Sequence, residues 1–82
     1  MDMTKFRLSI LDIDSVIYKK EVRSVFIPGD KGEFELLPCH YPLLSLIGEG
    51  DIIINWEDVV SVKRGIVKFL RNDCVAIVEM TI

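Results

Sequence analysis

The chain has 82 residues, which is enough for one small domain and too few for two. Half of the residues are hydrophobic, and Val, Ile, Leu and Phe make up 32 of the 82, which excludes an intrinsically disordered protein. The formal net charge is −3, without the cluster of Lys and Arg that nucleic-acid binding requires. Val and Ile number 20 whereas Ala occurs once, a composition that favours strands over helices. We therefore expect a single all-β domain over residues 1–82.

Alternating apolar and polar residues predict short strands along most of the chain. Residues 6–10 alternate with a period of two, as in a strand with one buried face. Similar runs follow, separated by Asp, Asn, Ser, Gly and Pro, the residues that favour turns. The expected strands include 6–10, 16–18, 22–27, 33–36, 51–54, 59–62, 66–70 and 74–80. Eight to ten such strands predict a sandwich or small barrel, because a single sheet would leave one apolar face in water.

Three places depart from this regular pattern. Residues 28–32 contain one Pro and two Gly, which predicts a tight turn on a rigid loop. Residues 37–44 contain Pro38 and Pro42, which donate no backbone hydrogen bond, so this segment should run along an edge or outside the sheet. Its apolar side chains form a docking surface or simply cap an open end of the sandwich, and the sequence leaves both open. Gly65 interrupts a strand pattern and predicts a bulge or a close backbone approach.

The residues that carry catalysis or bind metal are scarce. His40 is the single histidine, and Cys39 and Cys74 lack the spacing of a zinc site. Cys39 and His40 are neighbours, and neighbours in an extended chain point to opposite faces, which argues against a thiol–imidazole nucleophile. No motif for binding phosphate or a dinucleotide is present. We expect no catalytic residue, no metal and no cofactor.

The first residues lack the basic and apolar stretches of a secretion signal, so we expect an intracellular protein with reduced thiols. The longest uncharged stretch, residues 36–48, is 13 residues long, short of the roughly 20 that span a bilayer. We therefore expect a soluble protein.

Two adjoining segments resemble the ε subunit of F-type ATP synthase, called δ in mitochondria. The family's sequence pattern stands here as Ile27-Pro28-Gly29, Gly32-Glu33-Phe34 and Leu37-Pro38-Cys39-His40-Tyr41-Pro42-Leu43-Leu44. The resemblance covers about residues 5 to 80. Cys39 replaces a glycine of the family pattern, and Lys63-Arg64-Gly65 stands where serine and two glycines are usual.

The resemblance implies a sandwich of about ten strands and a role that is not enzymatic by itself. In that role the domain is a central-stalk subunit of the rotor, linking the γ subunit to the membrane c-ring for proton- or sodium-driven ATP synthesis. It implies c-ring contacts at Gly32, Glu33 and Phe34. It implies γ contacts at His40, Pro42, Leu43, Leu44 and Ser45. The implied location is peripheral, on the cytoplasmic face of an energy-transducing membrane, most simply the bacterial inner membrane.

The chain ends where the family's sandwich ends, so we expect it to lack the C-terminal helices and to couple the rotor without inhibiting ATP hydrolysis. An alternative is a carrier module of the lipoyl or biotinyl type, with Lys31 as the modified residue on a hairpin tip. A third reading is a small enzyme or metal protein that uses Cys39 and His40.

Overall fold

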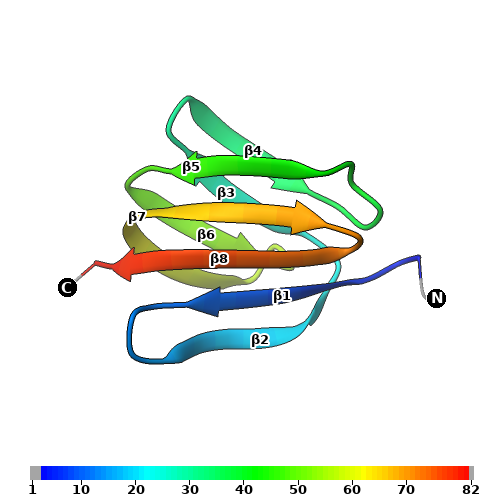
Figure 1. Ribbon diagram of the computed structural model, residues 1–82, viewed down its shortest axis with the longest axis horizontal. Helices are drawn as coiled ribbons and strands as arrows, with labels where there is room; N and C mark the ends of the chain where they lie inside the picture. The colour runs from blue at the N-terminus through cyan, green and yellow to red at the C-terminus, as the bar shows by residue number, and fades with distance from the viewer. Residues whose placement is uncertain (1–2, 82) are drawn as a thin grey trace.

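The computed structural model describes residues 3–81, and within that range the chain forms eight β-strands and no helix (Figure 1). The strands are β1 (Phe6–Leu11), β2 (Val16–Val22), β3 (Val25–Gly29), β4 (Gly32–Leu36), β5 (Leu43–Ile47), β6 (Gly50–Ile54), β7 (Asp58–Leu70) and β8 (Asp73–Met80). The prediction of an all-β sandwich is confirmed, with a strand count at the lower end of the range expected.

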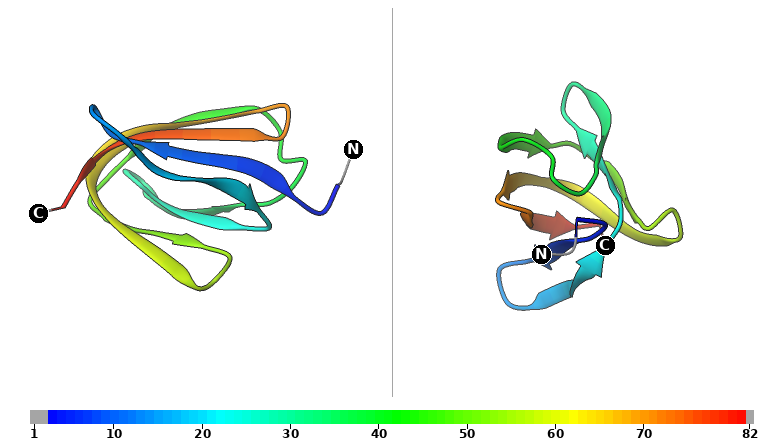
Figure 2. Two further views of the ribbon diagram at one scale, coloured as in Figure 1. Left: turned by 90° about the horizontal axis from the view of Figure 1, so that it is seen from below. Right: turned by 90° about the vertical axis from the view of Figure 1, so that its right-hand side faces the viewer.

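The strands form two layers that share one long strand (Figure 2). The first layer contains β5, the C-terminal half of β7, β8, β1 and β2, and the second contains β4, β3, β6 and the N-terminal half of β7. Residues 58–62 of β7 pair with β6, whereas residues 65–69 pair with β5. Strand β7 therefore belongs to both layers and joins them at one end of the sandwich, as the left view in Figure 2 shows.

A bulge at Lys63 and the glycine at position 65 allow β7 to bend. The register with β8 shifts between Val62 and Arg64, which leaves an extra residue on β7 and increases the local bend. A Cβ placed on Gly65 would lie 2.4 Å from the carbonyl oxygen of Ile77, so a side chain has no room there. Of the two readings of Gly65 from the sequence, a bulge or a close backbone approach, the close approach is confirmed at Gly65, and the bulge lies two residues earlier. The two strands expected at 59–62 and 66–70 are instead one continuous strand.

The core lies between the layers and is made of the inward side chains of every strand. Phe6 and Phe69 pack edge to face, with ring centroids 5.3 Å apart. Burial raises the pKa of the Cys74 thiol to about 12, with a smaller contribution from the Asp73 carboxylate. The buried hydrophobic residues are Phe6, Leu8, Ile10, Val22, Val25, Ile27, Leu36, Ile47, Ile52, Ile54, Val62, Val67, Phe69, Cys74, Ala76 and Val78.

Candidate interaction surfaces

The loop of residues 37–42 is held in place by the turn between β7 and β8. The backbone N–H of Cys39 donates to Asn72 Oδ1 at 2.7 Å, and Asn72 Nδ2 donates to the carbonyl oxygen of Lys5 at 2.8 Å. Within the loop, the N–H of His40 donates to the carbonyl oxygen of Leu37 at 3.2 Å. Residues 37–42 lie outside both layers, as the two prolines predicted, whereas Leu43 and Leu44, placed with them by the prediction, begin strand β5. Asn72 links the loop to Lys5, just before β1.

Cys39 has a φ of 65°, in the left-handed region that glycine adopts without strain. A glycine, which the family pattern has at this position, would adopt this conformation without strain, whereas this chain has a cysteine there. The hydrogen bond from Cys39 N–H to Asn72 is one interaction that holds the residue there.

The residues expected to contact γ divide into a supporting set and an exposed set. The His40 ring stacks on Tyr41, with centroids 4.3 Å apart, and packs edge to face with Phe69, with centroids 5.6 Å apart. His40 Nδ1–H donates to the carbonyl oxygen of Tyr41 at 2.7 Å. Leu43 is half-buried against the core, and Ser45 is also half-buried on the same side of β5. Pro42 and Leu44 are exposed, the latter by 68%.

An apolar patch covers the outer side of the first layer next to this loop. Leu46, Ile66 and Ile77 are directly paired across β5, β7 and β8, and all three are exposed. Pro42, Leu44 and Leu70 line one shallow depression, which joins the loop to the patch. The patch, called here the outer apolar face, consists of Leu44, Leu46, Ile66, Leu70, Val75 and Ile77. Exposed patches of this kind mark interaction sites.

Sequence reasoning identified only Leu44 of the outer apolar face. A signal for the rest was present, because residues 43–47 and 75–78 carry apolar side chains at nearly every position and not only at alternate ones. Such a run predicts apolar side chains on both faces of the strand. The sequence does not show which face of each strand remains exposed, because the arrangement of the two layers decides this.

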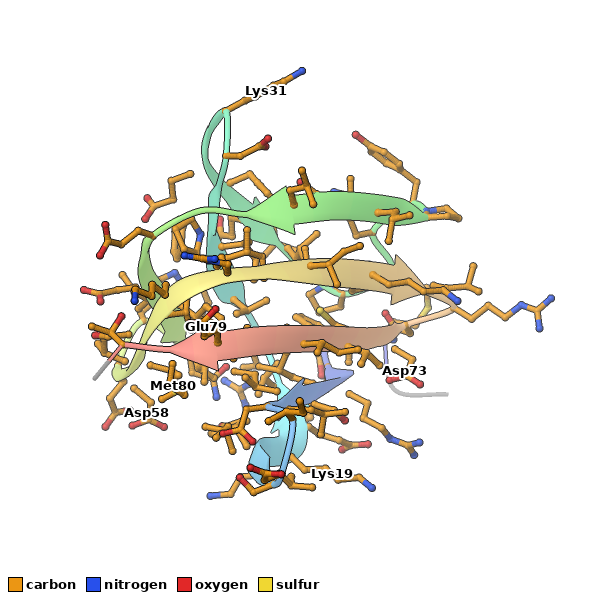
Figure 3. The ribbon with its side chains drawn as sticks, turned by 60° about the vertical axis from the view of Figure 1, so that its left-hand side comes forward. Lys19, Lys31, Asp58, Asp73, Glu79 and Met80 are labelled. Atoms are coloured by element: carbon orange, nitrogen blue, oxygen red, sulfur yellow. The ribbon has the colours of Figure 1, made fainter. Side chains whose placement is uncertain are left out.

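The residues expected to contact the c-ring lie on a charged hairpin between β3 and β4. Asp30, Lys31, Gly32 and Glu33, together called the hairpin tip, are all exposed, and Figure 3 shows Lys31 extending away from the ribbon. Phe34 is half-buried: a Cβ on Gly29 would lie 2.9 Å from its ring, so the ring covers that glycine.

The hairpin tip is fastened to the turn that follows β5. The N–H of Gly48 donates to the carbonyl oxygen of Pro28 at 2.7 Å, and the N–H of Asp30 donates to that of Leu46 at 3.4 Å. The hairpin tip and the loop at 37–42 therefore lie at opposite ends of β5 (Figure 1). The structure brings the expected γ contacts together at one end, and places the expected c-ring contacts together at the other.

Residues 3–81 contain no group of three or more His, Cys, Asp or Glu side chains arranged to hold a metal ion. Cys39 is exposed and Cys74 is buried, and both are free thiols. No helix long and apolar enough to cross a membrane occurs in the described residues.

Comparison with known sequences identifies close relatives. The family described as ATP synthase, Delta/Epsilon chain, beta-sandwich domain matches residues 5–82. An ATP synthase epsilon chain of Sulfurimonas denitrificans is 37% identical over 81 residues, covering 94% of this chain and 62% of that protein. One of Leptospira interrogans is 35% identical over 75 residues, covering 88% of this chain and 59% of that protein. The chain thus spans about six tenths of the length of these curated relatives.

Solved structures share the fold at low sequence identity. A chain in the Euglena gracilis mitochondrial ATP synthase, solved with OSCP, F1 and the c-ring, superposes with a TM-score of 0.81 at 14% identity, over 92% of this chain and 51% of that one. A chain in the central stalk and c-ring of the Tetrahymena thermophila mitochondrial ATP synthase gives 0.77 at 12% identity, over 96% and 66%. These two similarities establish the fold, and the family match with its epsilon-chain relatives establishes descent. The chain belongs to the family of the β-sandwich domain of ATP synthase delta and epsilon chains.

Proposed function

We propose that this protein is a non-catalytic subunit of the central stalk of an F-type ATP synthase, where it joins the γ subunit to the membrane c-ring. Its work is mechanical: it transmits rotation and holds the stalk together during ion-driven ATP synthesis. We place it peripherally on an energy-transducing membrane, on the cytoplasmic side. The family membership supports this role, and the observation that carries it is the outer apolar face.

The outer apolar face has the properties of a protein interface. Its exposed members lie in register on three neighbouring strands, so a flat partner surface covers them together. Burying apolar area contributes roughly 25 cal/mol per Å². The loop adjoins it through two depressions that share Pro42 and Leu70, one also lined by His40 and the other by Leu44. We assign this continuous surface to γ, because the residues expected to contact γ form its edge.

The hairpin tip has the opposite character and suits the c-ring. Its exposed charges, Asp30, Lys31 and Glu33, lie at the far end of β5 from the loop. Charged contacts at a rim give register and orientation more than affinity. A carboxylate at Glu33 is suited to attract the polar, basic loops of a membrane ring.

The carrier-module alternative depends on Lys31, which does stand on an exposed hairpin tip. The family match favours the stalk role, since the relatives named above are ATP synthase epsilon chains. An intact mass with a lipoyl or biotinyl adduct on Lys31 would restore the carrier reading.

A pair of matched variants tests the stalk role. Leu46 is exposed by 58% on the outer apolar face, and Val59 is exposed by 56% on the second layer. Each is changed to Glu, and the protein is co-expressed with its cognate γ subunit. We expect wild type and Val59→Glu to form a 1:1 complex that survives gel filtration. Leu46→Glu should weaken it about 100-fold, as expected for a charge placed in an apolar interface.

Two results would contradict the proposal. If the folded wild type fails to bind γ, the stalk role is wrong. If Leu46→Glu binds γ as well as Val59→Glu does, the outer apolar face is not the γ surface. Thermal melting of each variant shows that the fold is intact, which is expected because both side chains are exposed.

A further inference from the structure

A single charged side chain stands inside the outer apolar face. Lys68 on β7 is paired with Leu44 on β5 and with Val75 on β8. Along its own strand, Ile66 and Leu70 are the neighbours on the same side of the sheet. Lys68 is exposed, and it lines the same depression as Leu44 and Leu70. Apolar residues therefore flank Lys68 along its own strand and on both neighbouring strands.

Among the described residues, Lys68 forms no ion pair with a carboxylate. The one ion pair among residues 3–81 joins Arg64 to Glu79, at 3.5 Å. Asp73 is a carboxylate residue that lines a shallow depression together with Lys68, and it lies diagonally across from Lys68 because Asp73 pairs with Leu70. Asp73 also faces Arg7 on β1, its direct neighbour in the parallel register, and Figure 3 places it at the start of β8.

A partner that covers this face removes the charged group of Lys68 from water. Side chains in a strand stand roughly perpendicular to the sheet, so the ammonium points toward the partner. Removing an ammonium group from water without a counter-charge is strongly unfavourable. A paired charge at the same place instead favours the matching partner over others.

We infer that the γ surface seated on the outer apolar face places a carboxylate against the ammonium group of Lys68, so that Lys68 selects which γ subunit is accepted. This inference rests on the proposed function, in which γ is the occupant of this face. It names the chemistry that the partner must bring: an apolar surface with one acidic side chain near its centre.

The direction in which one substitution changes the Kd for γ tests the inference. Lys68→Met keeps most of the apolar stem and removes the charge. If γ carries the carboxylate, this change leaves it buried and unpaired, and the Kd for γ should rise about tenfold. If γ carries no carboxylate there, the same change removes a buried charge and the Kd should stay the same or fall. Lys63→Met, at the bulge of the same strand, is the matched control and should leave the Kd unchanged.

A double-mutant cycle then identifies the partner. Each exposed Asp or Glu of the cognate γ is changed to Asn or Gln and measured against wild type and Lys68→Met. One of these γ variants should lose affinity with wild type but lose none with Lys68→Met. Asp73→Asn should bind γ as wild type does, because the inferred carboxylate comes from the partner.

Three outcomes overturn the inference. These are an unchanged or lower Kd for Lys68→Met, a cycle in which no acidic residue of γ couples to Lys68, and a loss with Asp73→Asn that matches Lys68→Met and does not add to it. In each of these cases wild type still binds γ, so the proposed function stands. Failure of the folded wild type to bind γ is a different result, which removes the proposed function and this inference together.

Discussion

The two ends of β5 differ in chemistry although they belong to the same strand. At its start, the loop and the adjoining part of the outer apolar face present Pro42 and Leu44 to solvent. At its end, the hairpin tip presents Asp30, Lys31 and Glu33. The first surface suits a tight contact driven by apolar burial, and the second suits a weaker contact that is sensitive to salt.

This difference fits the proposed stalk role, in which the protein holds γ firmly and contacts the c-ring more weakly. An apolar interface stabilises a complex in proportion to the area removed from water. An exposed ion pair contributes about 0 to 1 kcal/mol and is screened at moderate ionic strength. Four experiments distinguish the proposed γ surface from the proposed c-ring surface, and both from the fold that supports them. They follow in order of decreasing expected effect.

The largest effect is expected at the bend of β7, because this strand supports both surfaces. In Gly65→Ala the new Cβ would meet the carbonyl oxygen of Ile77 at 2.4 Å, so the backbone of β7 or β8 must shift. We expect a loss of about 2–3 kcal/mol in the free energy of unfolding, measured by urea denaturation. Contacts at both ends of β5 should weaken together. Gly48→Ala is the control, since its Cβ meets nothing closer than 3.5 Å; equal stability of the two variants would contradict the role of Gly65 at the bend.

Leu43→Ala should affect the fold and the apolar surface but not the charged one. Leu43 is half-buried and pairs with Phe69, so its truncation should cost about 1–2 kcal/mol of stability. It should also weaken γ binding, because it supports the edge of the proposed γ surface. Leu36→Ala, in the core under the second layer, serves as the control. It should lose at least as much stability and still bind γ normally; a similar loss of γ binding in both variants would show that the effect is only one of stability.

The thiol beneath the outer apolar face should make stability fall at alkaline pH. The Cys74 pKa is about 12 in the folded state and 9.0 without burial. Above pH 9 the unfolded chain therefore releases a proton that the folded chain retains, and unfolding becomes easier. This contribution to stability is complete below pH 9 and is lost progressively as the pH rises toward 12.

Between pH 8 and pH 10, wild type should lose about 1 kcal/mol more than Cys74→Ala, as measured by urea denaturation at each pH. Burial raises the pKa of Tyr18 as well, with a smaller effect of Asp58, but this group is common to both proteins and cancels in the comparison. Parallel pH profiles for the two proteins would show that Cys74 does not carry the effect.

The smallest effect is expected at the hairpin tip. Glu33→Lys reverses one exposed charge and should weaken attachment to detergent-solubilised c-ring a few-fold at about 50 mM salt, and less at about 300 mM. Binding to γ should not change. Glu57→Lys makes the same charge change at the exposed turn between β6 and β7 and should leave both contacts intact. Equal loss of γ and c-ring binding in Glu33→Lys would show that the two surfaces have been assigned wrongly.

Much of this arrangement was predictable because local physical rules decide it. Alternation placed the inward side chains of β1 correctly, and the prolines at 38 and 42 kept residues 37–42 out of the sheet, since neither can donate a backbone hydrogen bond. Gly65 indicated a close backbone approach, and in the structure no side chain fits at this position against Ile77. The single strand β7 was not predictable in the same way: the break at residues 63–65 looks like a turn in sequence and is a bulge in the structure.

The sequence by itself determined the all-β class, the turns, the core side of most strands and the family, because these depend on composition, periodicity and local motifs. Only the tertiary structure decided which apolar side chains stay exposed. Leu46, Ile66 and Ile77 come from three strands and meet through the register of β5, β7 and β8, and Asn72 reaches a loop 33 residues away. Register and layer order arise from pairing between distant segments, so the outer apolar face and the position of Lys68 within it exist only in the folded molecule.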